Sequence, residues 1–258
     1  MNKRLVRLLW HLWLPLAMIA VYWIYSTSAN SPYWPSPPEM ATAFWDNWVF
    51  ERSVSDLVPS LVRFILGLSL GAGLGLMSGV LLGLSTKARR ALFPVTEFIR
   101  SLPKPALIPV SMVLLGVGTE QKVAIIAFAC VWPVFLNTVD GVRGVESTVM
   151  EMVQVYRIFG WRRLTRVTLP AATPQIFSGL RVALALGLLM MVFAEMFGSS
   201  NGLGYFIVQS QRLFAISDMW SGILLLGLLG FVVNALYLLV ERRVLRWHRG
   251  WRASLIDE

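Results

Sequence analysis

The sequence predicts an all-α integral membrane protein with about six transmembrane helices. Of its 258 residues, 56% are hydrophobic and 14% are charged, whereas about a quarter of the residues of a soluble domain are charged. Its apolar residues form runs long enough to cross a bilayer, which takes about 20 residues. Basic residues gather between these runs. We therefore treat residues 1–258 as a single transmembrane domain, in which residues 1–57 form an N-terminal span plus an external segment and residues 58–241 form the core.

Six apolar runs are candidate spans. They are, roughly, Leu8–Tyr25, Val58–Leu84, Leu92–Val117, Val123–Val139, Phe177–Phe197 and Met219–Val240. The first run is longer than the apolar part of a cleaved signal peptide, which has about 7–15 residues, so we expect a retained span. The third run contains Pro103, Pro105 and Pro109. Each proline lacks a backbone donor, which predicts a broken helix there.

Two further features are found just before the second span and within it. Before it, Phe44, Trp45 and Trp48 recur at helical spacing, which predicts a helix at the outer membrane interface. Within it, a glycine recurs every fourth residue. These glycines are Gly67, Gly71, Gly75, Gly79 and Gly83. Such a strip lets helix backbones approach closely in a membrane, and we favour packing inside one subunit over packing between subunits.

The distribution of basic residues predicts the orientation. If the N-terminus is cytoplasmic, most Lys and Arg residues fall in cytoplasmic segments, and the outer segments hold Arg52, Arg63, Lys122 and Arg212. This positive-inside bias predicts that both termini are cytoplasmic. It also accounts for the net charge of +9 without nucleic acid as a partner. The two histidines are far apart and the single cysteine lies in an apolar run, so we expect no metal site.

The segment 141–176 is unusually basic for this chain, and its centre reads "EMVQVYRIFGWRRLTRVTLP". Thr148 and Glu151 have the spacing of a capping box, which predicts a helix start, and Gly160 is placed to end that helix. A second amphipathic turn would then stop at Leu169-Pro170. The residues alone leave two interpretations open. One is a hairpin resting on anionic lipid, and the other is a knob that fits a cytoplasmic partner.

This stretch resembles the cytoplasmic signature of permease subunits of bacterial ABC importers. That signature reads Glu-Ala-Ala, three residues, Gly, nine residues, then Ile-x-Leu-Pro. The corresponding residues here are Glu151-Met152-Val153, Arg157 and Val167-x-Leu169-Pro170, with the same spacing. Both alanines are replaced, Arg157 stands at the glycine position, and Gly160 lies three residues further on. The stretches "PSLVRFILGLSLGAGLGLMSGVLLG" and "PQIFSGLRVALALGLLMMVFAEMFGSSNGLGYFI" are similar to the taurine, alkanesulfonate and nitrate branch of these permeases.

The resemblance implies a type I ABC importer permease fold with residues 141–176 as the cytoplasmic coupling segment. The chain would be a non-catalytic subunit in the bacterial inner membrane. It would form the pathway for a small solute, such as a sulfonate, taurine or nitrate. The implied partners are two ATPase subunits, a second copy of the chain and an external solute-binding protein, all assembled in the lipid bilayer. No G-x-x-x-x-G-K-[ST] stretch is present, so ATP and Mg²⁺ would bind to the partner ATPase and this chain would hold no cofactor.

Two groups of residues are candidates for function. The candidates for ATPase coupling are Glu151, Arg157, Ile158, Phe159, Gly160, Trp161, Arg162, Arg163, Leu169 and Pro170. The candidates for the translocation pathway are Arg100, Lys104, Met191 and Glu195. For Glu195 we favour a structural or gating role over contact with the substrate. Arg100 and Lys104 could attract an anion, although a position at the cytoplasmic interface is the slightly favoured alternative.

Two other classes of function compete with the importer. An ATP-independent channel or secondary transporter often shows internal repeats of spans, and no convincing repeat is present in the sequence. A membrane enzyme should show clustered His, Asp, Glu or Ser residues within its spans, and Glu195 is almost alone there. We therefore expect no catalytic residues, and the ATP-independent transporter remains the alternative.

Overall fold

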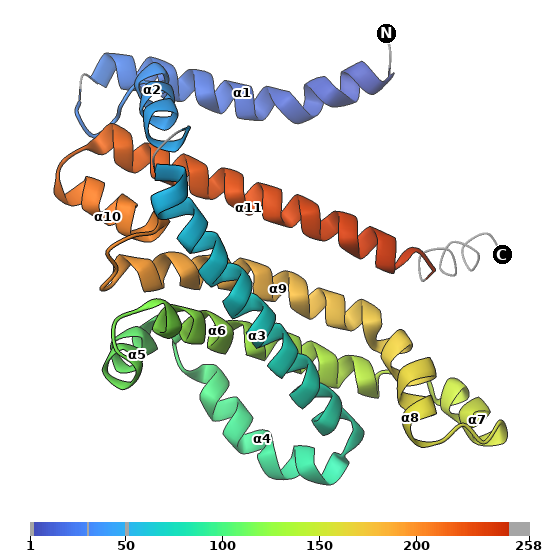
Figure 1. Ribbon diagram of the computed structural model, residues 1–258. Helices are drawn as coiled ribbons and strands as arrows, with labels where there is room; N and C mark the ends of the chain where they lie inside the picture. Colours follow the sequence, from blue (N-terminus) through green and yellow to red (C-terminus); the bar gives the residue numbers. More distant parts are fainter. Residues whose placement is uncertain (1–2, 30, 50–51, 248–258) are drawn as a thin grey trace.

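The computed structural model describes residues 3–29, 31–49 and 52–247, and within these residues every regular element is helical (Figure 1). The α-helices are α1 Lys3–Ala29, α2 Pro37–Trp48, α3 Val58–Leu84, α4 Thr86–Ser101, α5 Ile108–Leu115, α6 Thr119–Arg143, α7 Ser147–Val155, α8 Gly160–Arg163, α9 Leu169–Met196, α10 Leu203–Arg212 and α11 Ile216–Val244. Three short turns join them: η1 Ser53–Leu57 and η3 Leu164–Thr168 are π-helical, and η2 Lys104–Leu107 is a 3₁₀-helix. The all-α prediction is confirmed.

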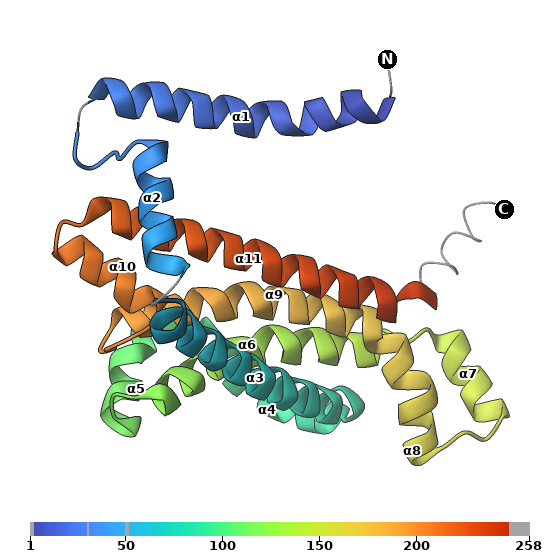
Figure 2. The ribbon, with the colours of Figure 1, turned by 45° about the horizontal axis from the view of Figure 1, so that its top comes forward.

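The centre of the fold is a close packing of α3, α6 and α9 (Figure 2). All five glycines of the predicted strip face α6. A Cβ atom built on Gly71 would lie 2.5 Å from the Ala127 carbonyl oxygen. One built on Gly179 of α9 would lie 2.6 Å from the Pro133 carbonyl oxygen, on another side of α6. Such distances are shorter than any real carbon–oxygen contact, so the absence of side chains is what lets these backbones meet.

Four helical stretches in the described part of the chain are long and apolar enough to cross a membrane. They are Ser53–Leu84, Thr119–Arg143, Gly160–Met196 and Ile216–Val244. The predicted break in the third run is confirmed, because Thr86–Ser101 and Lys104–Leu115 meet at an angle of 87° and together form either a fifth span or a re-entrant loop. Pro103 begins the break and Pro105 follows in η2.

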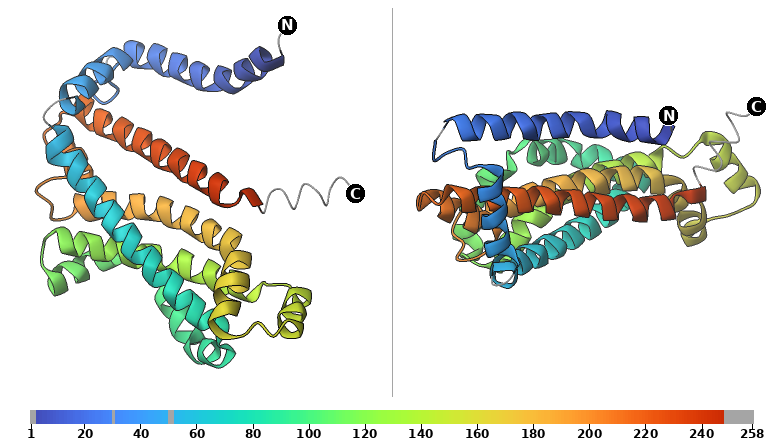
Figure 3. Two further views of the ribbon diagram at one scale, coloured as in Figure 1. Left: turned by 45° about the vertical axis from the view of Figure 1, so that its right-hand side comes forward. Right: turned by 90° about the horizontal axis from the view of Figure 1, so that it is seen from above.

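Helix α1 covers the predicted first span and stands apart from the packed centre (Figures 1 and 3). Its described contacts lie at its end near α2, where the Tyr22 hydroxyl donates to the Pro35 carbonyl over 2.8 Å. At about 1.5 Å per residue, 27 residues reach about 40 Å, which is long enough to cross a bilayer. That α1 crosses the membrane remains a prediction.

Helix α2 confirms the helix predicted before the second span, but Trp48 is buried in the protein and not exposed as an interfacial anchor would be. Its ring is 6% exposed and packs edge-on against Phe206 with 4.8 Å between centroids. Its indole nitrogen donates to Ser221 on α11 over 3.2 Å. Trp45 is 62% exposed and faces outward. Trp48 therefore belongs to the core, because its face of α2 is covered by α10 and α11.

The elements divide between two ends of the molecule. Helices α7 and α8 lie at one end, and α2, α5 and α10 lie at the other (Figures 1 and 3). Helix α1 begins, and α11 ends, at the α7–α8 end. We call residues 147–168, which include α7 and α8, the elbow. The end of the molecule that holds them is the elbow end, and the opposite one is the far end. The segment 141–176 thus lies on the same side of the molecule as the start of α1 and the end of α11.

Candidate functional site

The elbow, residues 147–168, is built from α7, a short link, α8 and η3. Helix α7 begins at Ser147 with Glu146 as its N-cap, and no side chain caps it. The predicted capping box of Thr148 and Glu151 is therefore wrong. Thr148 is the second residue of the helix, so its hydroxyl is not at the N-cap position that a capping box requires.

The link after α7 closes around Arg157, which has a φ of 52°. The Arg157 amide donates to the Gln154 carbonyl over 3.0 Å, and the Ile158 amide donates to the Val153 carbonyl over 2.9 Å. This pair of bonds is a Schellman motif, in which glycine normally takes the left-handed position. The helix therefore ends at Val155 and not at Gly160 as predicted. Arg157, at the glycine position of the signature, adopts the conformation that glycine would adopt there, at a cost of about 1–2 kcal/mol.

From Gly160 the chain forms one continuous helical stretch to Met196, through α8, η3 and α9. The predicted stop at Leu169-Pro170 is wrong. The π-helical turn Leu164–Thr168 widens the backbone just before Pro170, which then occupies the first turn of α9, where its missing donor is tolerated. The stretch changes direction between α8 and α9 (Figure 2), and α9 alone, with 28 residues at about 1.5 Å each, extends about 42 Å toward the far end.

The elbow presents large apolar side chains to its surroundings. Tyr156 is 76% exposed, and Trp161 is 75% exposed. Met152 and Val155 of α7 and Phe159 of the link are exposed as well. Glu151, which also lies on α7, is exposed too. The predicted coupling residues Arg157, Gly160, Arg162 and Arg163 are exposed too, whereas Ile158 and Leu169 are half-buried. Apolar patches of this kind mark contact surfaces.

At the far end, α9 carries a buried ionic cluster. Glu195 is 1% exposed and Arg63 of α3 is 5% exposed. Arg63 Nη1 donates to Glu195 Oε1 over 2.8 Å, and Ser60 Oγ lies 2.7 Å from Glu195 Oε2. Arg63 Nη2 also donates to the side-chain oxygen of Asn201 over 2.6 Å. The cluster fastens α3, α9 and the loop after α9 to one another.

The first turn of α10 is held by the same cluster. The Gly204 amide donates to Glu195 Oε2 over 3.1 Å, and the Leu203 amide donates to Ser60 Oγ over 2.9 Å. The Gly202 amide donates to Asp56 Oδ1 over 2.8 Å. Carboxylates are stabilised beside helix N-terminal amides because those amides carry partial positive charge. Glu195 is therefore fully engaged inside the subunit.

Arg63 and α10 were not predicted as parts of this site. Arg63 was assigned to an outer segment, although it lies within the run Val58–Leu84. A charged residue inside a span almost always has a partner. Arg63 and Glu195 are each isolated charges within an apolar run, so the sequence could have suggested that they pair. Helix α10 is only 10 residues long, too short to stand out among apolar runs.

The other pathway candidates lie in different surroundings. Met191 is fully buried in the core. Arg100 pairs with Glu97 over 2.6 Å, and Lys104 donates to the Arg100 carbonyl over 2.8 Å. Because α4 runs from the elbow end of α3 back toward the far end (Figure 1), Arg100 in its last turn lies away from the elbow end. In the described residues no group of three His, Cys, Asp or Glu side chains is arranged to hold a metal ion.

Comparisons with known proteins agree with this architecture. The family described as binding-protein-dependent transport system inner membrane component matches residues 71–246. The putative aliphatic sulfonates transport permease protein SsuC of Bacillus subtilis (strain 168) is 31% identical over 240 residues, covering 92% of this chain and 87% of that protein. The bicarbonate transport system permease protein CmpB of Synechococcus elongatus is 28% identical over 248 residues, covering 90% and 89%.

A solved structure shares the fold. It is titled inward facing conformations of the MetNI methionine ABC transporter, and its matching chain has a TM-score of 0.63 and 18% sequence identity. The match covers 73% of this chain and 94% of that one. At this identity the likeness establishes the fold alone.

Proposed function

Because the chain belongs to the family of binding-protein-dependent transport system inner membrane components, it is the membrane-spanning permease subunit of an ABC importer, and we propose that its solute is a small anion. Its relatives are named for aliphatic sulfonates and for bicarbonate, both of which carry negative oxygen atoms. A sulfonate, taurine, nitrate or bicarbonate fits this chemistry. Arg100 and Lys104, on the uncovered bend between α4 and η2, are the cations that would attract it.

The elbow carries the proposed contact with a separate ATPase. The observation that supports it is the exposed set of apolar side chains, including Phe159 and Trp161, on a segment rich in arginine. A lipid-resting hairpin would direct its apolar face toward the membrane, whereas α7 and α8 lie at the end of the structure beyond the packed centre of α3, α6 and α9 (Figure 2). ATP and Mg²⁺ would bind to that partner.

The continuous helix from Gly160 to Met196 supplies a route for coupling. A push on α8 by the closing ATPase would move along one helix to Glu195, in the last turn of α9. The Glu195–Arg63 pair would pass that motion to α3 and α10. We assign Glu195 a gating role on this basis, since its oxygens are already bonded within the chain. Met191, one turn earlier, would move with it.

A second copy of the chain completes the proposed pathway. Helices α4 and η2 have no buried residue, and α5 buries only Ile108 among its described side chains. Val113 is 86% exposed and Leu114 is 75% exposed on α5. Two such arms facing each other would enclose a path between copies. Residues 58–241 would form this transport core, with residues 1–57 at its periphery.

The elbow and the distribution of charges together support a proposed orientation. We place the elbow end in the cytoplasm, because Arg157, Arg162, Arg163 and Arg166 lie there and the positive-inside rule favours that side. Both termini would then be cytoplasmic, and the far end would face the solute-binding protein.

Reconstitution tests this function. The chain, its co-encoded ATPase and its solute-binding protein are placed in nanodiscs, and ATP hydrolysis is followed while candidate anions are added. We expect hydrolysis to rise only when the solute-binding protein carries its anion. Uptake of the anion by vesicles that contain this chain alone would instead support an ATP-independent transporter.

A further inference from the structure

We propose that a cavity at the far end of the molecule, together with the rim beside it, is the docking site for the external solute-binding protein, which inserts a Lys or Arg side chain there. This inference rests on the proposed function, since it presupposes a binding-protein-dependent importer whose far end faces outward. It adds the surface, the residues and the chemistry of the contact.

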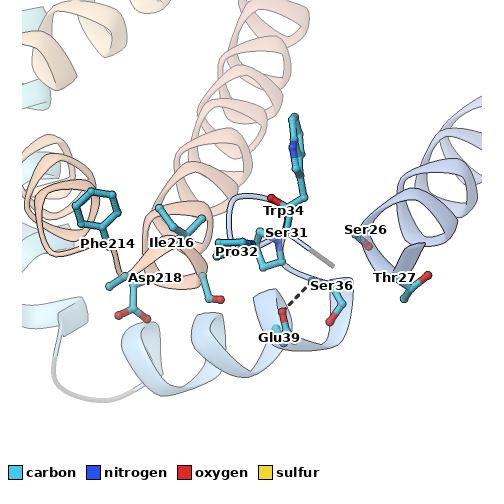
Figure 4. A pocket seen from close by; sticks show the side chains of 13 residues that line it. Ser26, Thr27, Ser31, Pro32, Trp34, Ser36, Glu39, Phe214, Ile216 and Asp218 are labelled. Atoms are coloured by element: carbon cyan, nitrogen blue, oxygen red, sulfur yellow. Dashed lines mark hydrogen bonds between the residues drawn. The ribbon is translucent and has the colours of Figure 1, made fainter. Parts of the chain in front are cut away.

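The cavity has a volume of about 780 Å³ and is formed by three segments that are distant in sequence. They are the last turn of α1, the stretch 31–39 that leads into α2, and the turn between α10 and α11. Figure 4 shows Glu39 on one side of it and Asp218 with Phe214 on the other. The cavity lies at the end opposite the elbow, where the helices α2 and α10 are found (Figure 1).

The walls of the cavity are held in place by aromatic contacts. The Trp34 ring lies 5.8 Å from the Tyr25 ring and 6.2 Å from the Trp220 ring. The Trp220 indole nitrogen donates to the Tyr33 carbonyl over 3.4 Å. Prolines further limit the backbone freedom of the stretch 31–38. A preformed wall lowers the entropy cost of binding a partner.

The charge of the cavity favours a cationic occupant. Its described lining holds two carboxylates, Glu39 and Asp218, and neither Lys nor Arg. Glu39 Oε2 accepts from the Ser36 amide over 3.0 Å, and Asp218 Oδ1 accepts from Asn47 over 2.8 Å. The second oxygen of each carboxylate has no hydrogen bond from another described residue. An anionic solute or an anionic lipid headgroup would be repelled here, whereas a basic side chain would be attracted.

The rim supplies an apolar anchor beside these charges. Leu213 is 67% exposed and Phe214 is 74% exposed. Phe214 has a φ of 55°, and the amides of Phe214 and Ala215 donate to Gln211 and Ser210 over 3.1 and 2.9 Å. This is a Schellman motif whose left-handed position usually holds glycine. The ring makes no ring contact within the described chain, so it contributes little to the fold. Aromatic side chains, phenylalanine among them, are enriched in protein–protein interfaces.

Binding of the labelled solute-binding protein to the nanodisc-embedded importer tests this surface. Phe214→Gly removes the ring and relieves the backbone strain, so the fold is preserved. Glu39→Gln with Asp218→Asn removes both charges but keeps the oxygen atoms that accept from Ser36 and Asn47. We expect each change to raise the Kd at least about tenfold, and the charge variant to reduce its salt dependence. ATP hydrolysis without the binding protein should equal that of the wild type.

Matched controls use residues outside the cavity. Asp46→Asn removes an exposed carboxylate from the same helix as Glu39, and Phe231→Ala removes an exposed ring from α11; both should bind like the wild type. An unchanged Kd in the cavity variants would overturn the inference, even if transport at saturating binding protein became slower. If the wild-type importer itself shows no stimulation by the binding protein, the proposed function fails, whereas a working importer with indifferent variants refutes the docking site alone.

Discussion

Arg63 Nη1 lies 2.8 Å from Oε1 of Glu195, although 132 residues separate the two in the chain. Both side chains are buried, so the pair joins α3 to α9 at the end farthest from the elbow. Removing one partner leaves an uncompensated buried charge, which costs far more than removing both.

The first prediction concerns this pair. Arg63→Ala or Glu195→Ala should each lower the free energy of unfolding by about 3–5 kcal/mol. The double replacement Arg63→Met with Glu195→Leu should cost less than either single change. Thermal unfolding in detergent, followed for each variant, measures this. Additive losses in the double variant would show that the two charges do not depend on each other.

The second prediction concerns the glycine strip. Gly71→Ala should destabilise the chain by about 1–3 kcal/mol, because its Cβ would lie 2.5 Å from the Ala127 carbonyl oxygen. Gly73→Ala is the matched control on the same helix, since a Cβ there meets nothing within 4 Å. Alanine has the higher helix propensity, so the control should be neutral or stabilising. Equal melting temperatures for both variants would contradict the packing described for α3 and α6.

The third prediction concerns Arg157. Arg157→Gly should raise the stability of the elbow by about 1 kcal/mol, because glycine takes the left-handed conformation without strain. Arg157→Val should lower it, since a β-branched residue is least suited to that backbone. Hydrogen exchange of the Ile158 amide, which closes the motif, reports this locally. Faster exchange in the glycine variant than in the wild type would be the opposite result.

The fourth prediction concerns sidedness. Cys130 is fully buried, so it should not react with a membrane-impermeant thiol reagent in intact cells. Leu213→Cys should then be labelled from outside, and Trp161→Cys only after the cells are opened. Labelling of position 161 in intact cells would reverse the proposed orientation.

Long apolar runs were predictable, and local backbone geometry was not. The bounds of α3, Val58–Leu84, coincide with the predicted second span, because composition alone defines such a run. The ends of α7 depended on competing signals: Thr148 and Gly160 both fit capping rules, yet the helix begins at Ser147 and ends before Arg157. The end of α7 is set by the Schellman bonds of the Arg157 and Ile158 amides, a local geometry that the composition of the segment does not reveal.

The candidate site shows the same division. Phe159 and Trp161, which the sequence offered as coupling candidates, are exposed, and their contact with an ATPase stays a prediction. The ionic cluster was found in part, since Glu195 was singled out without its partner. A pair that is 132 residues apart leaves no periodic trace, and only the close packing of α3 with α9 brings it together.

The central claim is that the elbow binds a separate ATPase, and capture of that ATPase by the tagged permease tests it most directly. Phe159→Ala with Trp161→Ala removes two exposed rings and should leave the melting temperature unchanged. Trp45→Ala, another exposed ring on α2 at the opposite end, is the control. We expect the elbow variant to lose at least about nine-tenths of the captured ATPase, as expected for loss of interface hot spots, and the control to retain all of it. Full capture by the elbow variant would contradict the account.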